Sequence, residues 1–368
     1  MEKPLQLGGW QLFAMTAAFV AGTSFILLPV GIISAARQFG WLVQLWSTLF
    51  GVIAGAFWLY VSSRYPGLSL VQIAQQALGK YVGGFVSLCY ILFFVQMAAW
   101  VTRNMSDYMQ INLMPRTPIS MFNILALLVC AYAVIKGIDT IAMVSVVILP
   151  ILMIAYWTPF TVMLREWDWR NFNYPGTFEW LPTLAETKYA LGFPFMETVV
   201  FMMAFPLVRR KLNTAFLGGI AFMGFQLALG IFFTIGLLGV YRGSHLTYPI
   251  YIIFREMQFS NFIEHLEAII SVNALLLVFL KLSILFYFAV SAICQLFAIQ
   301  SRAVVAYPLV WIISAYALFF SNIVENAEWV QNYLFIYYVP FGFGFPLLFL
   351  VASWVRNRDR SMKKEAAI

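Results

Sequence analysis

Long, nearly uninterrupted apolar blocks recur along this chain and limit its possible folds more than any other feature. Two examples are residues 124–135 and 268–280. Crossing the hydrocarbon core of a bilayer, ~30 Å thick, takes roughly 20 helical residues. The full apolar segments exceed a barrel strand of ~9–11 residues and show no alternation of polar and apolar positions. Because only 10% of the residues are charged, the sequence predicts an all-α polytopic membrane protein.

Polar breaks divide the apolar sequence into about ten predicted transmembrane helices. The first block is too long for the apolar region of a signal peptide and is predicted to remain as the first span. Residues 165–187 have little apolar character, so we interpret them as an external linker between two halves. The predicted spans are 10–36, 41–63, 83–112, 119–136, 139–164, 188–207, 213–241, 268–297, 304–321 and 331–356.

The distribution of basic residues predicts the orientation in the membrane. With a cytoplasmic N-terminus, 13 of the 22 lysines and arginines lie inside and 7 outside, with Arg103 and Lys281 within spans. Basic residues favour the cytoplasmic side of a membrane. Both termini are therefore predicted to be cytoplasmic, with residues 357–368 as a basic tail. This orientation explains the net charge of +7 without nucleic-acid binding.

The ten spans divide into two sets of five, residues 1–164 and 188–356. Glycine, proline and polar residues interrupt the middle of the first span near 21–24 and of the sixth near 192–197. Short amphipathic segments, 69–78 and 249–257, occupy matching places in the two sets. Because five is odd, the sets have opposite orientation, which is typical of an inverted-repeat transporter fold of the LeuT-like kind. The alternative is that these glycines and prolines serve helix packing alone.

The two breaks are candidate binding segments. A helix broken in the bilayer leaves backbone groups unpaired, and a small zwitterion could satisfy them at a midplane site. The alternative for the Thr23 and Ser24 hydroxyls is a hydrogen bond back to their own helix. The candidate substrate-binding residues at the breaks are Gly22, Thr23, Ser24, Phe193, Pro194, Phe195, Met196 and Glu197.

Four charged residues and one methionine inside spans complete the candidate site. Glu197 and Lys281 lie near mid-span, where a charge costs at least ~2.5–3.5 kcal/mol, so both are predicted to face the bundle interior. They form a buried pair, or Glu197 is protonated. Arg103 and Asp107 share a helix face and are predicted as a local pair with a possible gating role. Met97 is a candidate pocket wall, with plain packing as the alternative.

The sequence offers little material for enzyme catalysis. The three cysteines, Cys89, Cys130 and Cys294, lie in apolar helices without a CxxC pair, and both histidines, His245 and His265, lie in connecting segments. Phosphate-binding loops, a Ser-His-Asp set and metal-ligand spacings are absent from the sequence. We therefore predict no enzyme activity, no cofactor and no metal.

Several short sequences, in their order and spacing, give the chain a resemblance to one family. They are Gly22 to Pro29, residues 77–83, Thr102-Arg103, residues 116–119, Met196-Glu197, residues 248–250 and residues 287–289. Over nearly its whole length the chain resembles the GerAB-type spore germination proteins, the B subunits of nutrient germinant receptors. This family belongs to the amino acid–polyamine–organocation transporter superfamily. Ser24 departs from the glycine that family members often carry there.

The resemblance implies a role in spore germination at the spore inner membrane. It implies a small nutrient ligand, an amino acid, bound at the unwound middle of spans one and six, and partner subunits of the A and C types. In superfamily transporters a buried ammonium can replace sodium, which is a possible role for Lys281. The rival hypothesis is a proton-coupled amino-acid transporter, and a third is a membrane scaffold with an occluded pocket. Receptor and carrier can share one fold, so the sequence leaves both open.

Overall fold

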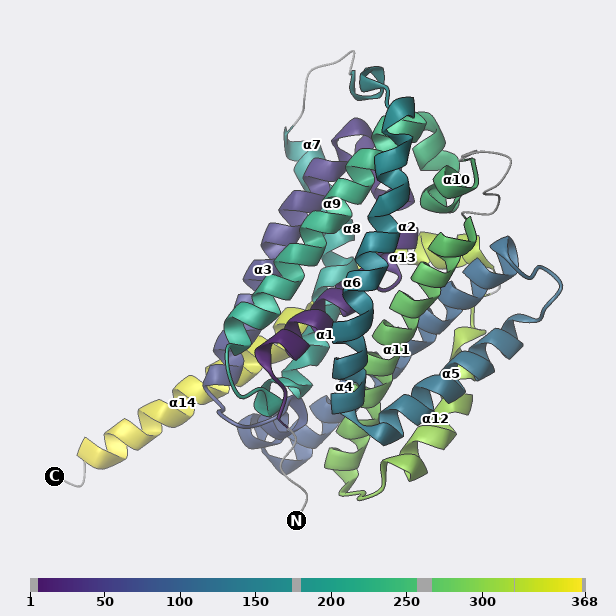
Figure 1. The fold of residues 1–368 in the computed structure, drawn as a ribbon. Coiled ribbons are helices and arrows are strands. Elements are labelled where there is room, and N and C mark those ends of the chain that lie inside the picture. The colour runs from purple at the N-terminus through teal and green to yellow at the C-terminus, as the bar shows by residue number, and fades with distance from the viewer. Residues whose placement is uncertain (1–5, 174–179, 257–266, 321, 366–368) are drawn as a thin grey trace.

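A computed structural model describes residues 6–173, 180–256, 267–320 and 322–365 of the chain. Figure 1 shows a bundle of helices, and within these ranges the sole β contact is an isolated bridge between Leu7 and Val208. The all-α prediction is therefore confirmed. His265, residues 174–179 of the predicted linker, residue 257 of the second amphipathic segment and the last three residues of the tail lie outside the described ranges.

The helices follow the predicted spans closely. Span one is divided into α1 and α2, and spans six and ten are composite. The main elements are α1 Gly9–Ala21, α2 Ser24–Ala36, α3 Gly40–Ser63, α4 Leu70–Asn112, α5 Ile119–Lys136, α6 Ile138–Val162, α7 Trp180–Ala185, α8 Thr187–Ala190, α9 Leu212–His245, α10 Pro249–Glu256, α11 Glu267–Phe297, α12 Arg302–Ala317, α13 Ile323–Val339 and α14 Phe345–Glu365.

Seven described helical stretches are long and apolar enough to cross a membrane. The first of them, Ser24–Ser63, joins half of span one to span two, and the last, Ile323–Val355, joins α13 to α14. Three shorter apolar helices, Gly9–Ala21, Leu191–Met203 and Arg302–Ala317, supply the rest of span one and spans six and nine. Together these pieces give the ten predicted crossings of an integral membrane protein.

Both predicted helix breaks are present. In span one, α1 ends at Ala21 with Gly22 as its C-cap, and α2 starts at Ser24. In span six, the four-residue α8 passes into a wide turn at Leu191–Phe195, where Phe193 has non-helical torsions (φ −125°, ψ 117°) and the Phe193–Pro194 peptide is cis. A tight 3₁₀ segment, Met196–Met203, follows. The interruptions lie at the glycine and proline residues because these residues support a regular helix poorly.

Packing between the two five-helix sets follows their repeat relationship. The second and seventh spans, α3 and α9, pack against each other, as do the third and eighth, α4 and α11, and the fourth and ninth, α5 and α12. Helix α1 lies among α6, α9 and α11, so the first break is in the centre of the bundle. This arrangement is the 5+5 inverted repeat; the boundaries of the repeats at residues 164 and 188 stay a prediction.

The amphipathic segments are helical. The first continues into span three as α4, but Gly79 interrupts it with φ 83° and ψ 173°, a backbone conformation that favours glycine. Ser69 caps α4 by accepting a hydrogen bond from the Gln72 backbone. The second segment forms α10, which packs on α9 and α11. Helix α4 therefore contains both the predicted amphipathic segment and the predicted third span, and Gly79 marks the boundary between them.

Span ten differs from its predicted bounds because α13 starts at Ile323, about two turns before residue 331. Asn322 caps this start by accepting a hydrogen bond from the Glu325 backbone, which explains why a polar stretch is helical. Near its middle, the helix widens at Pro340–Gly344. Side chains from α3 and α4 satisfy the carbonyls freed there: Trp58 Nε1 donates to Gly342 O at 2.6 Å, and Tyr90 Oη donates to Phe341 O at 2.7 Å.

Candidate ligand-binding site

A buried ion pair connects the broken sixth helix to α11. Lys281 Nζ donates to Glu197 Oε2 at 2.5 Å, and the side chains are 0% and 5% exposed, respectively. Of the two alternatives left open by the sequence, the structure contains the pair. Two opposite charges are tolerated in this apolar setting because each offsets the desolvation of the other.

The break in the first helix makes room for Lys281. A Cβ atom added to Gly22 would lie 2.3 Å from Cδ and 3.0 Å from Cβ of Lys281. The alkyl chain of Lys281 thus occupies the space that a side chain at position 22 would fill. It passes the break and reaches Glu197. A glycine at this position is required by close packing against another helix.

The second carboxylate oxygen of Glu197 and the lysine ammonium have further partners. Tyr338 Oη, from α13, donates to Glu197 Oε1 at 3.1 Å. Lys281 Nζ lies 4.7 Å from the centroid of the Phe193 ring and 5.2 Å from that of Phe19, distances at which an aromatic face attracts a cation. Helices one, six, eight and ten therefore all contribute to one charged centre.

A cavity of about 370 Å³, here called the central cavity, reaches this centre. Its walls come from α2, α4, the sixth-helix break, the connection between α9 and α10, and α13. Thr23, Phe193 and Glu197 line its inner end. Thr247, in the connection after α9, also lines the cavity. Its volume lies within the ~300–1,000 Å³ range of small-molecule sites.

Three of the predicted binding residues, Thr23, Phe193 and Glu197, line the central cavity, and the others do not. The Thr23 hydroxyl is buried without a hydrogen-bond partner in the described structure. Ser24 Oγ is likewise buried and without a partner there. The remaining predicted residues are buried outside its lining: Gly22, Ser24, Met97, Pro194, Phe195, Met196 and Lys281. Phe195 packs over Gly51 of α3, and Met196 over Gly342.

The predicted Arg103–Asp107 pair forms and also connects two helices. Arg103 Nε donates to both carboxylate oxygens of Asp107, at 2.9 and 3.0 Å, and both residues are buried. Its Nη1 donates to the Phe320 carbonyl and, at 3.4 Å, to Ala317 O, at the end of α12. The guanidinium thereby satisfies carbonyls that a helix end leaves unpaired. Its predicted gating role stays a prediction.

Sequence reasoning missed several residues of the site. Tyr338 and Phe19, which contact Glu197 and Lys281, read as ordinary apolar-helix residues. The bond from Asn326 Nδ2 to Asn104 Oδ1, 2.9 Å, joins two residues that line the central cavity from α13 and α4. The one available signal was the Pro340–Gly344 sequence, a third interruption by glycine and proline close to Tyr338. Among the described residues, no three His, Cys, Asp or Glu side chains are placed to hold a metal ion.

Comparison with known proteins gives the family. Residues 6–328 match the family described as spore germination protein. The chain belongs to this family. It is 27% identical to spore germination protein KB of Bacillus subtilis (strain 168), over 97% of each chain.

Solved transporter structures share the fold of this family member. A Na⁺-coupled sialic acid symporter has a TM-score of 0.68 at 12% identity, covering 96% of this chain and 80% of the symporter. The transporter MhsT, solved with L-phenylalanine, has a TM-score of 0.61 at 13% identity, covering 94% of this chain and 97% of MhsT. At such identities the likeness establishes the transporter fold alone.

Proposed function

We propose that this protein is the nutrient-sensing subunit of a spore germinant receptor in the spore inner membrane. It binds a small nutrient, an amino acid, in the central cavity and signals to partner subunits of the A and C types. The observation that carries the proposal is that one cavity reaches both helix breaks, through Thr23 in the first and Phe193 and Glu197 in the sixth.

The chemistry of the inner end suits a zwitterion. The amino end of α2, a helix of 13 residues, begins beside Thr23. Unpaired backbone N–H groups and the helix dipole favour a carboxylate there, and the unpartnered Thr23 hydroxyl is a further donor. The Glu197 carboxylate lines the same cavity and has lone pairs to accept a hydrogen bond from a ligand ammonium, in addition to those from Lys281 and Tyr338. A fold relative solved with L-phenylalanine supports the amino-acid class.

A proton-coupled amino-acid transporter is the second candidate. The buried pair of Glu197 and Lys281 favours it, because two titratable groups beside a ligand cavity could exchange a proton during a transport cycle. A transporter moves the ligand across the membrane and a receptor does not. Measuring ligand uptake therefore distinguishes the two functions.

The test combines binding and uptake. The full chain, in nanodiscs with and without co-expressed A and C subunits, is titrated with radiolabelled amino acids, each separately. We expect saturable binding of one or a few, weakened about tenfold by Thr23→Val, which removes one hydrogen bond to a charged group. The matched control, Thr158→Val on the exposed side of α6, should bind normally.

Three results would change the proposal. The absence of binding in both preparations would overturn it. Equal binding by Thr23→Val and wild type would show that the ligand does not bind at the inner end of the cavity. Concentrative, pH-driven uptake into proteoliposomes that contain this chain alone would replace the receptor with the transporter.

A further inference from the structure

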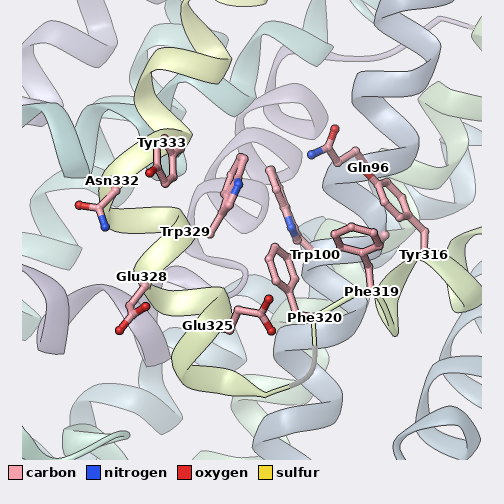
Figure 2. A pocket seen from close by; sticks show the side chains of 11 residues that line it. Gln96, Trp100, Tyr316, Phe319, Phe320, Glu325, Glu328, Trp329, Asn332 and Tyr333 are labelled. Carbon is pink, nitrogen blue, oxygen red and sulfur yellow. The ribbon is translucent and has the colours of Figure 1, made fainter.

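A second cavity, of about 500 Å³, lies between α4, the end of α12 and α13 (Figure 2). We call it the lateral aromatic cavity. Gln96, Glu325, Glu328 and Asn332 are its polar lining residues. Its aromatic lining residues are Trp100, Tyr316, Phe319, Phe320, Trp329 and Tyr333.

The rings form a connected group. The centroids of Trp100 and Trp329 are 4.7 Å apart, those of Phe320 and Trp329 6.4 Å, and those of Phe319 and Phe320 6.0 Å. Figure 2 shows the Glu325 carboxylate turned toward Phe320 and Trp100. Electron-rich ring faces and a carboxylate thus meet at one place, and tryptophan is the strongest aromatic partner of a cation.

The charge of the lining is negative. Glu325 and Glu328 contribute two carboxylates, and none of the eleven lining residues is basic. Arg103 approaches from the α4 side to bond the Phe320 carbonyl, but its charge is balanced by Asp107 at 2.9 Å. A cation in this cavity would therefore meet attraction from the carboxylates and the rings together.

We propose that the lateral aromatic cavity binds an organic ammonium group, carried by a soluble amine or by a zwitterionic lipid headgroup. The rim is open to either source, because Phe319 is 75% exposed and Tyr333 is 59% exposed. The methyl or methylene groups of the ligand pack on the rings while its charge faces Glu325. Trp100 and Glu328 line both cavities, so the ammonium group shares a wall with the central cavity. The proposal is independent of the function assigned to the central cavity.

The experiment is calorimetric titration of the purified full chain in detergent with choline and with its neutral isostere, 3,3-dimethylbutan-1-ol. Choline should bind saturably, and the neutral alcohol about tenfold more weakly. Glu325→Gln and Trp329→Leu should each weaken choline binding about tenfold. Trp311→Leu, an exposed tryptophan of α12 outside the lining, and Glu166→Gln, an exposed glutamate of the linker, are matched controls that should bind normally.

Nanodiscs identify the source of the ammonium group. Weaker apparent binding of choline in phosphatidylethanolamine than in phosphatidylglycerol assigns the site to a lipid headgroup. Equal binding in the two lipids assigns it to a soluble amine. Both results support the proposal.

The proposal is overturned by no saturable choline binding to the wild type, by equal binding of the neutral isostere, or by unchanged choline binding in both cavity variants. Size-exclusion chromatography verifies that each variant is folded, and Glu325→Gln, a conservative change at an exposed site, guards against misfolding of Trp329→Leu.

Discussion

Lys281 Nζ of α11 lies 2.5 Å from Glu197 Oε2, and this contact joins the eighth span to the broken sixth beside the gap in the first. Both side chains are almost fully buried. In so apolar a setting either charge alone would lack compensation, whereas the two together are stable. The pair therefore connects the parts of the fold that surround the inner end of the central cavity.

Removing one charge of this pair should be more harmful than removing both. Glu197→Gln and Lys281→Met each leave an uncompensated partner, at a cost of about 3–5 kcal/mol, and should lower the abundance of the protein and its nutrient response. The double variant should recover part of the loss in abundance, because both charges are absent. The measurement is immunoblot abundance and germination response in spores. A double variant as poor in abundance as the worse single one would contradict a structural pair.

Gly22→Ala should destabilise the protein although the change adds one methyl group. Its Cβ would lie 2.3 Å from Lys281 Cδ, so either the lysine side chain that reaches Glu197 or the backbone at the break must shift. We expect a loss of at least ~1–3 kcal/mol, as for overpacking of a core, seen as a lower midpoint of thermal unfolding in detergent. Gly84→Ala is the control, since nothing lies within 4 Å of its added Cβ and alanine favours a helix. Equal midpoints for the two variants would refute this packing role.

Arg103→Met should cost far more stability than loss of an exposed pair. Asp107 would stay buried without its partner and the Phe320 carbonyl would lose its donor, at about 3–5 kcal/mol together. The matched control is Arg170→Met, whose partner Asp168 lies in the exposed linker, where solvent screens the pair and its loss should change stability little. The midpoints of thermal unfolding of both variants measure the difference in stability. A similar small loss of stability for both would show that the contacts of Arg103 with Asp107 and the Phe320 carbonyl do not stabilise the fold.

Reporter fusions at residues 1 and 368 should both report the cytoplasmic side. The expectation comes from the 13-to-7 asymmetry of basic residues and from an even number of crossings. In Figure 1, α14 extends beyond the end of the bundle where the chain enters α1. Alkaline phosphatase and green fluorescent protein fusions, active on opposite sides of the membrane, provide the measurement. Opposite sides for the two ends would contradict ten crossings.

Sequence reasoning located the spans and breaks because their causes are local. Apolar length sets a crossing, and a glycine or proline at mid-span weakens a helix whatever surrounds it. The main error in the bounds concerned α13, which starts at Ile323 because a polar cap at Asn322 supports a helix that hydropathy does not reveal. At the site, Thr23, Phe193 and Glu197 were found from the breaks alone. Tyr338 was not, since its bond to Glu197 spans 141 residues of sequence.

By itself, the sequence determined that this chain crosses the membrane about ten times, that spans one and six are interrupted, and that Glu197 and Lys281 face inward. These features follow from the energetics of single helices in lipid, where each buried charge or broken turn carries its own cost. Tertiary structure decided which groups meet: Lys281 over Gly22, Tyr338 on Glu197, and six rings with two carboxylates around a lateral cavity. Such meetings depend on the relative rotation and depth of different helices, which packing between them fixes and local sequence does not encode.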